Sequence, residues 1–219
     1  ASDDVDAVLG GIGREYDTIT TTEQLDHWLA VLSAAPLIAF DTETTSLDYR
    51  EARIVGLSFC AEPGKAAYLP MEHNYAGAPE QVKLARALDL LKPWLESAAH
   101  AKVGQNLKFD AHILANHGIT LRGIAHDTLL ESYVLEVHER HDMDSLAHRH
   151  LGWKTITYDE VTGKGAARIP FAEVEVARAT DYAAEDADCA LALHEVLHPR
   201  VAGDADLQRV YERIEMPVL

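Results

Sequence analysis

The chain has 219 residues, of which 47% are hydrophobic, and a formal net charge of −17. This composition predicts one compact domain with a real core, and we find no apolar run of membrane-spanning length and no secretory signal. The negative charge disfavours tight binding of nucleic acid by this segment alone, because non-specific binding usually needs lysine and arginine against phosphate.

The first half of the chain alternates between helical and strand patterns. Residues 1–20 are acidic with little periodicity, and we expect a linker or a frayed end there. A helix is expected at 22–32, where Leu25 and Trp28 share one face. Short links between apolar runs predict an antiparallel meander. The remaining expectations are strands at 37–40, 54–60, 66–70 and 102–104, and helices at 80–95 and 107–117, the last closed by Gly118.

The second half is mainly helical. Helices are expected at 128–137 and at 207–215. Another should run from a cap at Asp142 or Asp144 to about residue 151. Most of 171–197 should also be helical, after a turn near 174–176. Residues 153–168 contain glycines and cations and are expected to form a mobile loop. Strands that alternate with helices predict an α/β fold with a mixed central β-sheet flanked by helices.

Two acids follow the apolar run 37–40 directly. Asp41 and Glu43 are two residues apart, so on a strand both carboxylates would project from the same face. Holding two like charges there costs free energy unless a cation is bound. The alternative is a solvated turn, since Asp and Thr are common turn residues.

Two more acids lie on predicted helices. Asp110 falls in the first turns of its helix, where it could also be an ordinary polar position behind a cap at Asn106. Tyr182 and Asp186 are spaced i and i+4 and share a helix face, so that a hydroxyl and a carboxylate could contact the same water.

For Tyr182 and Asp186 the alternative is that they lie on a solvated acidic helix face, because Asp181 and Glu185 have the same spacing. Taken together, however, the acids at 41, 43, 110 and 186 indicate a metal-dependent nuclease. Mg²⁺ prefers carboxylate oxygen and water as ligands. Two such ions about 3.5–4 Å apart cleave phosphodiesters by in-line displacement.

The combination of motifs resembles the 3′–5′ proofreading exonuclease domain of bacterial family A DNA polymerases, of the polymerase I type, from about residue 16 to 219. The motifs that carry the resemblance are Phe-Asp-Thr-Glu-Thr at 40–44, Lys-Val-Gly-Gln-Asn-Leu-Lys-Phe-Asp at 102–110, Arg-His-Asp-Met-Asp-Ser-Leu at 140–146, Tyr-Ala-Ala-Glu-Asp-Ala-Asp at 182–188 and Glu-Arg-Ile-Glu-Met-Pro at 212–217.

The resemblance implies a ribonuclease H-like fold and the acid set of the DEDD exonucleases, in the subclass with a tyrosine. In that pattern Asp41, Glu43 and Asp186 hold one of two divalent cations, Mg²⁺ (or Mn²⁺). Asp41 bridges to the second cation, which Asp110 supports largely through water. Tyr182 matches the tyrosine that orients the attacking water together with Glu43. The resemblance makes Glu185 a residue behind the site or at the surface.

Further positions match residues that contact substrate in this family. Leu47 matches a wedge against the terminal base, and Gln105 and Asn106 match polar residues beside the substrate. Tyr158 matches an aromatic that stacks on a nucleotide, and Arg140 matches an arginine on a phosphate. The alternatives are a minor core position for the leucine, a packed strand position for the tyrosine and a surface ion pair for the arginine.

The implied activity is hydrolysis of single-stranded or frayed DNA 3′ ends to 5′-dNMPs, which selects mismatched ends because melting costs least there. The expected partners are the DNA 3′ end, the dNMP product and a polymerase domain that is absent from these 219 residues, with no membrane. That domain and the bound cations would offset the negative charge.

The expected division of the chain is a linker at 1–20, an exonuclease domain at 21–205 and the start of the connection to the polymerase domain at 206–219. The rivals are an RNA-trimming exonuclease and a domain kept as a scaffold; the motifs at 140–146 and 212–217 favour DNA.

Cys60 and Cys189 lie in apolar segments and are expected to be reduced, buried thiols, which favours a cytoplasmic, nucleoid-associated location. Four histidines invite a zinc hypothesis, but no pair among them has the His-x3-His spacing of one helix face, and no cysteine is nearby. We therefore expect surface or cap roles for His138, His141, His148 and His150.

Overall fold

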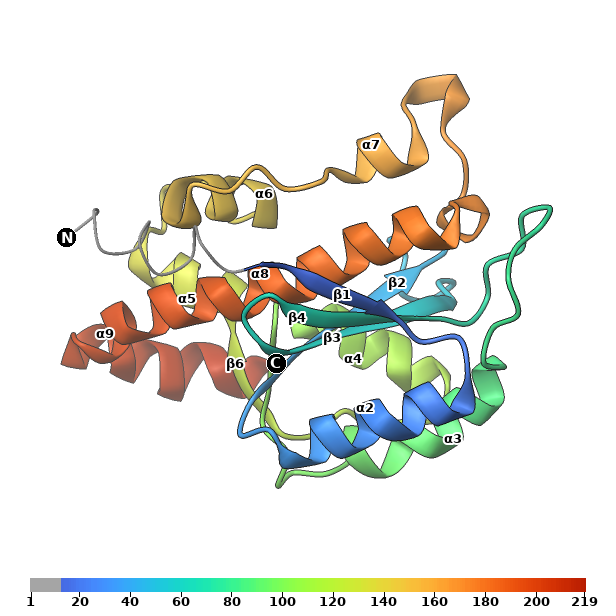
Figure 1. Ribbon diagram of the computed structural model, residues 1–219. Helices are drawn as coiled ribbons and strands as arrows, with labels where there is room; N and C mark the ends of the chain where they lie inside the picture. The colour runs from blue at the N-terminus through green and yellow to red at the C-terminus, as the bar shows by residue number, and fades with distance from the viewer. Residues whose placement is uncertain (1–12) are drawn as a thin grey trace.

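The computed structural model describes residues 13–219, and within them a mixed six-stranded sheet lies between two layers of helices (Figure 1). The strands are β1 (Glu15–Thr18), β2 (Ile38–Thr44), β3 (Ile54–Glu62), β4 (Lys65–Pro70), β5 (Lys102–Gly104) and β6 (Ile124–Asp127). Their order across the sheet is β1-β4-β3-β2-β5-β6. The predicted α/β class and mixed sheet are confirmed.

Helices cover both faces of this sheet. The α-helices are α2 (Thr22–Ala34), α3 (Leu84–Leu95), α4 (Leu107–Asn116), α5 (Thr128–Leu135), α6 (Met143–Leu146), α7 (Tyr158–Thr162), α8 (Val176–Ala202) and α9 (Ala205–Val210). Short π-helical turns at Ala147–Leu151 and Tyr211–Glu215 continue α6 and α9, and 3-10 turns lie at Gly165–Ala167, Phe171–Glu173 and Met216–Val218. Figure 1 shows α2, α3 and α4 on one side of the sheet and the long α8 crossing the other.

The alternation of side chains along β2 explains the two layers. Strands β2, β3 and β4 form the predicted antiparallel meander. Phe40 faces the α2–α4 layer, where its ring lies 5.8 Å from that of Phe59 and 6.3 Å from that of Trp94. Ala39 faces the opposite way and packs with Cys60 and the alanines of α8. Because successive strand residues point to opposite faces, the next odd-numbered positions, 41 and 43, belong to the α8 side.

The two strands at the edges of the sheet, β1 and β6, were not predicted. An irregular end is wrong for residues 15–20, since β1 pairs in parallel with β4 and Ile19 is fully buried; residues 1–12 lie outside the described part of the chain. The hydroxyl of Tyr16 donates to Asp188 Oδ2 on α8 at 2.8 Å. Short edge strands with polar residues carry little alternation, so tertiary pairing decides their conformation.

Two other boundaries differ from the sequence expectation. The helix expected at 80–95 begins at Leu84, because the Gln81 side chain bonds both backbone groups of His73, at 2.9 and 2.8 Å, and holds this segment out of the helix. The loop expected at 153–168 contains α7, which is stabilised by a capping box between Thr157 and Glu160. The helix end at Gly118 is confirmed by its φ of +71°.

Cys60 and Cys189 are both buried and free, as expected. Among residues 13–219, no helix combines the length and the apolar character that crossing a bilayer requires.

Candidate active site

Three of the predicted acids meet where β2 faces α8. Asp41 and Glu43 project from β2 and Asp186 from α8, and one carboxylate oxygen of each lies within 4.8 Å of the others. The i, i+2 spacing on a strand brings the first two together, and the crossing of α8 over the sheet adds the third. Carboxylates that are 145 positions apart in the chain (186 − 41) thus form one cluster.

The fourth acid, Asp110, lies next to this cluster on α4. Strand β2 pairs with β5 through Ile38 and Ala39, and β5 ends at Gly104, so the next part of β2 faces the start of α4. There the hydroxyl of Thr42 donates to Asp110 Oδ1 at 2.6 Å. Asp110 is buried, and its charge contributes to raising the pKa of Glu43, after burial and the two other acids. It lies beside the group of three rather than within it.

The electrostatics of the cluster are those of a cation site. Burial, followed by the charge of Asp186, raises the pKa of Asp41 to about 8. Burial also raises the pKa of Asp186 to about 8, and the neighbouring Tyr182 hydroxyl opposes this rise. Burial and the nearby carboxylates raise the pKa of Tyr182 itself, so its hydroxyl stays protonated. Buried like charges at this spacing are unfavourable without a counter-charge, and hard divalent cations take carboxylate oxygen.

The start of α4 is held by a residue that the sequence analysis missed. Asn106 is the N-cap residue, but it adopts a left-handed backbone with φ of +63° and makes no side-chain cap bond, so the alternative of a capping Asn106 side chain does not hold. Instead, the Asp127 carboxylate accepts from the backbone amides of Asn106 at 3.2 Å and Leu107 at 2.7 Å. It also accepts from the amides of Leu129 and Leu130 and so caps α5. Its position directly before the predicted helix at 128 was the available signal for the cap of α5, but not for its contact with α4.

Gly104 permits the close approach of β5 to β2. A Cβ at this position would lie 2.7 Å from the Phe40 carbonyl oxygen and 2.6 Å from the Leu107 side chain. Both contacts are too short for real atoms. Glycine here therefore sets the distance between the strand that carries Asp41 and the helix that carries Asp110.

A cleft opens over the acids, and most of the predicted substrate residues line it. Leu47 is 91% exposed, which excludes the minor core alternative. Tyr158 is the first residue of α7 rather than a strand residue, and its ring stacks on Phe171 at 6.1 Å. The lining residues come from β2 and the turn after it, from α4 and the two residues before it, from α7 and the segment after it, and from α8. They are Asp41, Thr42, Glu43, Thr44, Ser46, Leu47, Gln105, Asn106, Phe109, Asp110, Tyr158, Arg168, Tyr182 and Asp186.

Gln105 lines the cleft but its amide already has protein partners. Its Nε2 donates to the His141 carbonyl oxygen at 2.7 Å, and its Oε1 accepts from the Thr128 hydroxyl. The side chain thus joins the start of α4 to the 140–142 segment.

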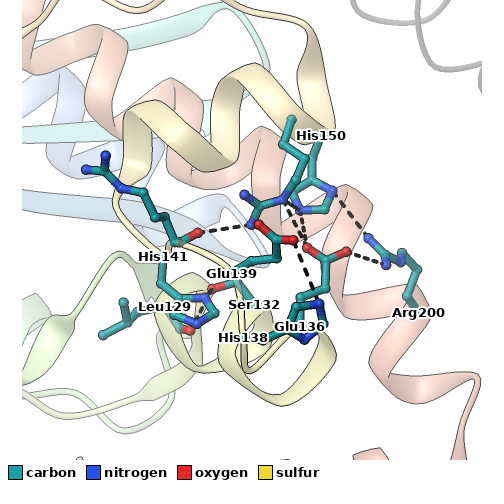
Figure 2. A network of polar contacts seen from close by, with 10 residues as sticks. Leu129, Ser132, Glu136, His138, Glu139, His141, His150 and Arg200 are labelled. Carbon is teal, nitrogen blue, oxygen red and sulfur yellow. Dashed lines mark hydrogen bonds and ion pairs between the residues drawn. The ribbon is translucent and has the colours of Figure 1, made fainter.

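Arg140 is the predicted site residue that the structure does not bring to the cleft. Its exposed guanidinium pairs with Asp142 at 2.9 Å, which favours the surface ion pair alternative. Asp142 is also the cap of α6. Figure 2 shows the neighbouring network, in which Glu136 binds Arg200 at 2.9 Å and lies 3.3 Å from His150. This segment is fastened to α8 by ion pairs, outside the cleft.

Arg168 was not predicted to act at the site, and Glu185 lies behind it, which is one of the two places that the resemblance implied. Arg168 lines the cleft, with its guanidinium 5.7 Å from the Tyr158 ring centroid. Glu185 is buried rather than solvated: it accepts from Arg14 at 2.9 Å and from the backbone amide of Ile156 at 2.6 Å. The second contact fixes the segment that leads to Tyr158.

The sheet topology and the acids on β2, α4 and α8 define the class: a ribonuclease H-like nuclease of the DEDD exonuclease type. The family model described as 3′-5′ exonuclease matches residues 16–202, and the chain belongs to this family.

Its sequence relatives are DNA polymerases. The chain is 47% identical over 208 residues to the DNA polymerase I of Pseudomonas aeruginosa, a match that covers 94% of this chain and 23% of that protein. It is 44% identical over 222 residues to the DNA polymerase I of Rhizobium leguminosarum, which covers 93% of this chain and 22% of the relative. The chain therefore spans less than a quarter of the length of these relatives.

Solved structures share the fold at low identity. Pol1 of M. smegmatis, in complex with DNA primer-template and dNTP, aligns with a TM-score of 0.70 and 21% identity over 92% of this chain and 30% of that one. RNase D of Trypanosoma brucei aligns with a TM-score of 0.65 and 16% identity over 88% and 66%. Brucella melitensis NrnC with bound Mg²⁺ aligns with a TM-score of 0.56 and 18% identity over 94% of each chain.

Proposed function

We propose that this chain removes nucleotides from single-stranded or frayed DNA 3′ ends as 5′-dNMPs, as the proofreading part of a DNA polymerase I. One observation carries the proposal: a chain 47% identical to a DNA polymerase I keeps four acids and Tyr182 around a single cleft. The polymerase domain of the same protein is the proposed partner, with residues 206–219 as the connection to it, in a cytoplasmic, nucleoid-associated setting.

The acid cluster fits hard divalent cations because its donors are buried or half-buried carboxylates with raised pKa values. We assign Asp41, Glu43 and Asp186 to one Mg²⁺ or Mn²⁺, and Asp41 with Asp110 to a second. When bound, such a pair supplies an activated water and stabilises the charge on the leaving oxygen.

The protein residues supply positioning. The Tyr182 hydroxyl stays protonated, so it can donate a hydrogen bond to the attacking water while Glu43 accepts one. Leu47 stands exposed at the mouth of the cleft, where it can wedge against a terminal base. The Tyr158 face offers a stacking surface that tolerates any base. With a net charge of −17, the chain alone should bind DNA weakly.

The direct test is Asp110→Ala, measured as release of monophosphates from labelled single-stranded DNA with Mg²⁺. The rate should fall by about 10²-fold or more, because a bound metal ion lowers the activation barrier by several kcal/mol. Asp89→Ala is the matched control, since Asp89 is an exposed acid on α3. An unchanged rate in Asp110→Ala would remove that residue and the two-metal account with it.

Two comparisons separate this function from its rivals. Matched DNA and RNA single strands should be cut with a clear preference for DNA; a preference for RNA would favour an RNA-trimming exonuclease. Calorimetric titration with Mn²⁺ should show binding that Asp41→Asn weakens. A scaffold domain would show no such binding.

A further inference from the structure

A second cluster of metal-ligand side chains lies at the other end of α8. His194 and His198 are one turn apart on that helix, His126 is on β6 and Glu131 is on α5. One ligand atom of each lies within 4.8 Å of all the others. The Nδ1 atoms of His194, His198 and His126 lie 2.8, 3.3 and 3.6 Å from the same oxygen, Glu131 Oε1.

These separations are close to the distances between neighbouring ligand atoms around one metal ion. Zinc binds imidazole nitrogen at about 2.0–2.1 Å and carboxylate oxygen at about 2.0–2.2 Å in tetrahedral sites, so neighbouring ligand atoms are about 3.3–3.5 Å apart. The three nitrogen–oxygen distances bracket that value. The three imidazole rings also lie against one another, with centroid separations of 4.2, 4.3 and 5.0 Å.

Hydrogen bonding within the described residues leaves this cluster unsatisfied. His126 Nδ1, His198 Nδ1 and Glu131 Oε2 are buried atoms that find no hydrogen-bond partner in residues 13–219. Glu131 Oε1 accepts from His194, and the Tyr211 hydroxyl donates to it at 3.5 Å. Four polar atoms thus crowd one oxygen that has two lone pairs. Unpaired buried groups of this kind are costly, and a cation at the centre would satisfy the nitrogens.

The surroundings hold the four side chains in place. Glu131 is fully buried, and Tyr211, which contacts it, also accepts from the backbone amide of Asp127 at 3.1 Å. The cluster joins β6, α5, α8 and the π-helical turn at Tyr211–Glu215.

We propose that His126, Glu131, His194 and His198 bind one Zn²⁺ ion, which fastens β6 and α5 to α8. Three imidazoles and one carboxylate are zinc ligands, whereas Mg²⁺ prefers all-oxygen sites. A shell of four protein ligands leaves no open position, which is typical of a structural site. The cluster shares no residue with the acid cluster, so the proposal does not depend on the nuclease function.

The spacing that the sequence analysis sought among other histidines is present here, as His194-x3-His198. The other two ligands are distant in the chain, and only the fold brings them in. Within residues 13–219 the four histidines considered first form no comparable cluster; His150 and His141, for example, contact Glu136 and Ser132.

The test uses the chain stripped of metal by EDTA and dialysed, in the Asp41→Asn background so that the acid cluster does not compete. Zinc binding is measured by competition with a chromogenic chelator, and Co²⁺ by its visible absorption. We expect one ion per chain, a tetrahedral Co²⁺ spectrum, and a melting temperature raised by about 5–10 °C at a Zn²⁺ concentration about 100-fold above Kd.

The ligand variant is His198→Gln, chosen because this side chain is partly exposed and its loss leaves the core packed. Its zinc affinity should fall by more than about tenfold, and zinc should no longer raise its melting temperature. The matched control, His138→Gln, changes an exposed histidine and should bind as the parent does. Equal affinity in His198→Gln and its parent, or no binding in the parent, would show that the cluster is a metal-free hydrogen-bonded network.

Discussion

One helix carries two clusters of opposite chemistry. Near its start, α8 contributes Tyr182 and Asp186 to a group of carboxylates; two turns later it contributes His194 and His198 to a group of imidazoles. Both pairs use the i, i+4 spacing, so helix geometry does not distinguish them. The difference lies in the partners, which are acids of β2 in one case and His126 with Glu131 in the other.

This difference teaches how one small domain can sort cations. Carboxylate oxygens suit Mg²⁺ and Mn²⁺, whereas imidazoles suit Zn²⁺. The acid cluster opens on a cleft where substrate can enter. In the histidine cluster the buried Glu131 contacts Tyr211, and the four side chains together supply a complete tetrahedral shell. An oxygen site that opens on a cleft is suited to reaction, and a nitrogen site with a complete protein shell is suited to holding elements together.

The largest expected effect separates the two clusters by activity. Asp186→Asn should lower kcat by about 10²–10⁴-fold, because it removes a proposed ligand of cations that would lower the barrier by several kcal/mol. His194→Gln should leave kcat within about threefold while it abolishes zinc binding. Both are measured on labelled single-stranded DNA at saturating Mg²⁺. Equal losses of activity would mean that α8 carries one functional unit rather than two.

The next effect tests whether the clusters communicate. Asp127 follows His126 directly and holds the start of α4, which carries Asp110. Asp127→Asn should lower kcat by about tenfold through displacement of that acid, in line with the loss of a residue that supports a metal ligand. Zinc affinity should change by less than about threefold. The control is Asp142→Asn, another capping acid, which should leave kcat unaltered.

The pH dependence of stability should also differ between the clusters. In the metal-free chain, burial raises the pKa of Asp41 and Asp186 to about 8, against about 4 when unfolded. Between these values the folded state binds more protons than the unfolded state, so the free energy of unfolding falls as the pH rises.

The melting temperature of the metal-free chain should therefore drop by several degrees from pH 5 to pH 8.5, and Mg²⁺ should restore most of it at pH 8.5. Asp41→Asn should flatten the profile, and His198→Gln should not. A profile that is equally steep in Asp41→Asn would assign the slope to other groups.

The smallest expected effect concerns the Tyr211 hydroxyl, which contacts Glu131 in the histidine cluster. Tyr211→Phe loses one buried hydrogen-bond partner, worth about 1 kcal/mol, so the melting temperature should fall by about 2–4 °C with kcat unchanged. Tyr133→Phe is the control, because Tyr133 is exposed. A loss of activity in Tyr211→Phe would show that a change in the histidine cluster affects the cleft over the acids.

The acid cluster could be predicted from the sequence because its members lie in short motifs whose local structure is itself predictable. An apolar run that leads into Asp41 and Glu43 predicts a strand end, and Tyr182 with Asp186 predicts a helix face. The antiparallel meander and α8 followed from periodicity in the same way. The functional roles of these residues stay predictions until the variants are measured.

The remainder depends on contacts between distant segments. β1 and β6 are short and polar, and pairing at the sheet edges makes them strands. Asp127 caps α4 from 20 positions away in the chain, which no local pattern shows. His194 and Glu131 are 63 positions apart, so the helical histidine pair alone could not identify its partners.

The contact between Glu185 Oε2 and the backbone amide of Ile156, at 2.6 Å, has a consequence for substrate and cation together. Glu185 is the immediate neighbour of Asp186, and Ile156 lies two residues before Tyr158. A nucleotide whose binding shifts the Tyr158 segment would therefore alter a contact next to Asp186, a proposed cation ligand. Thermodynamic reciprocity then requires that each ligand changes the affinity for the other by the same factor. Titrations of one at fixed levels of the other would measure that shared factor.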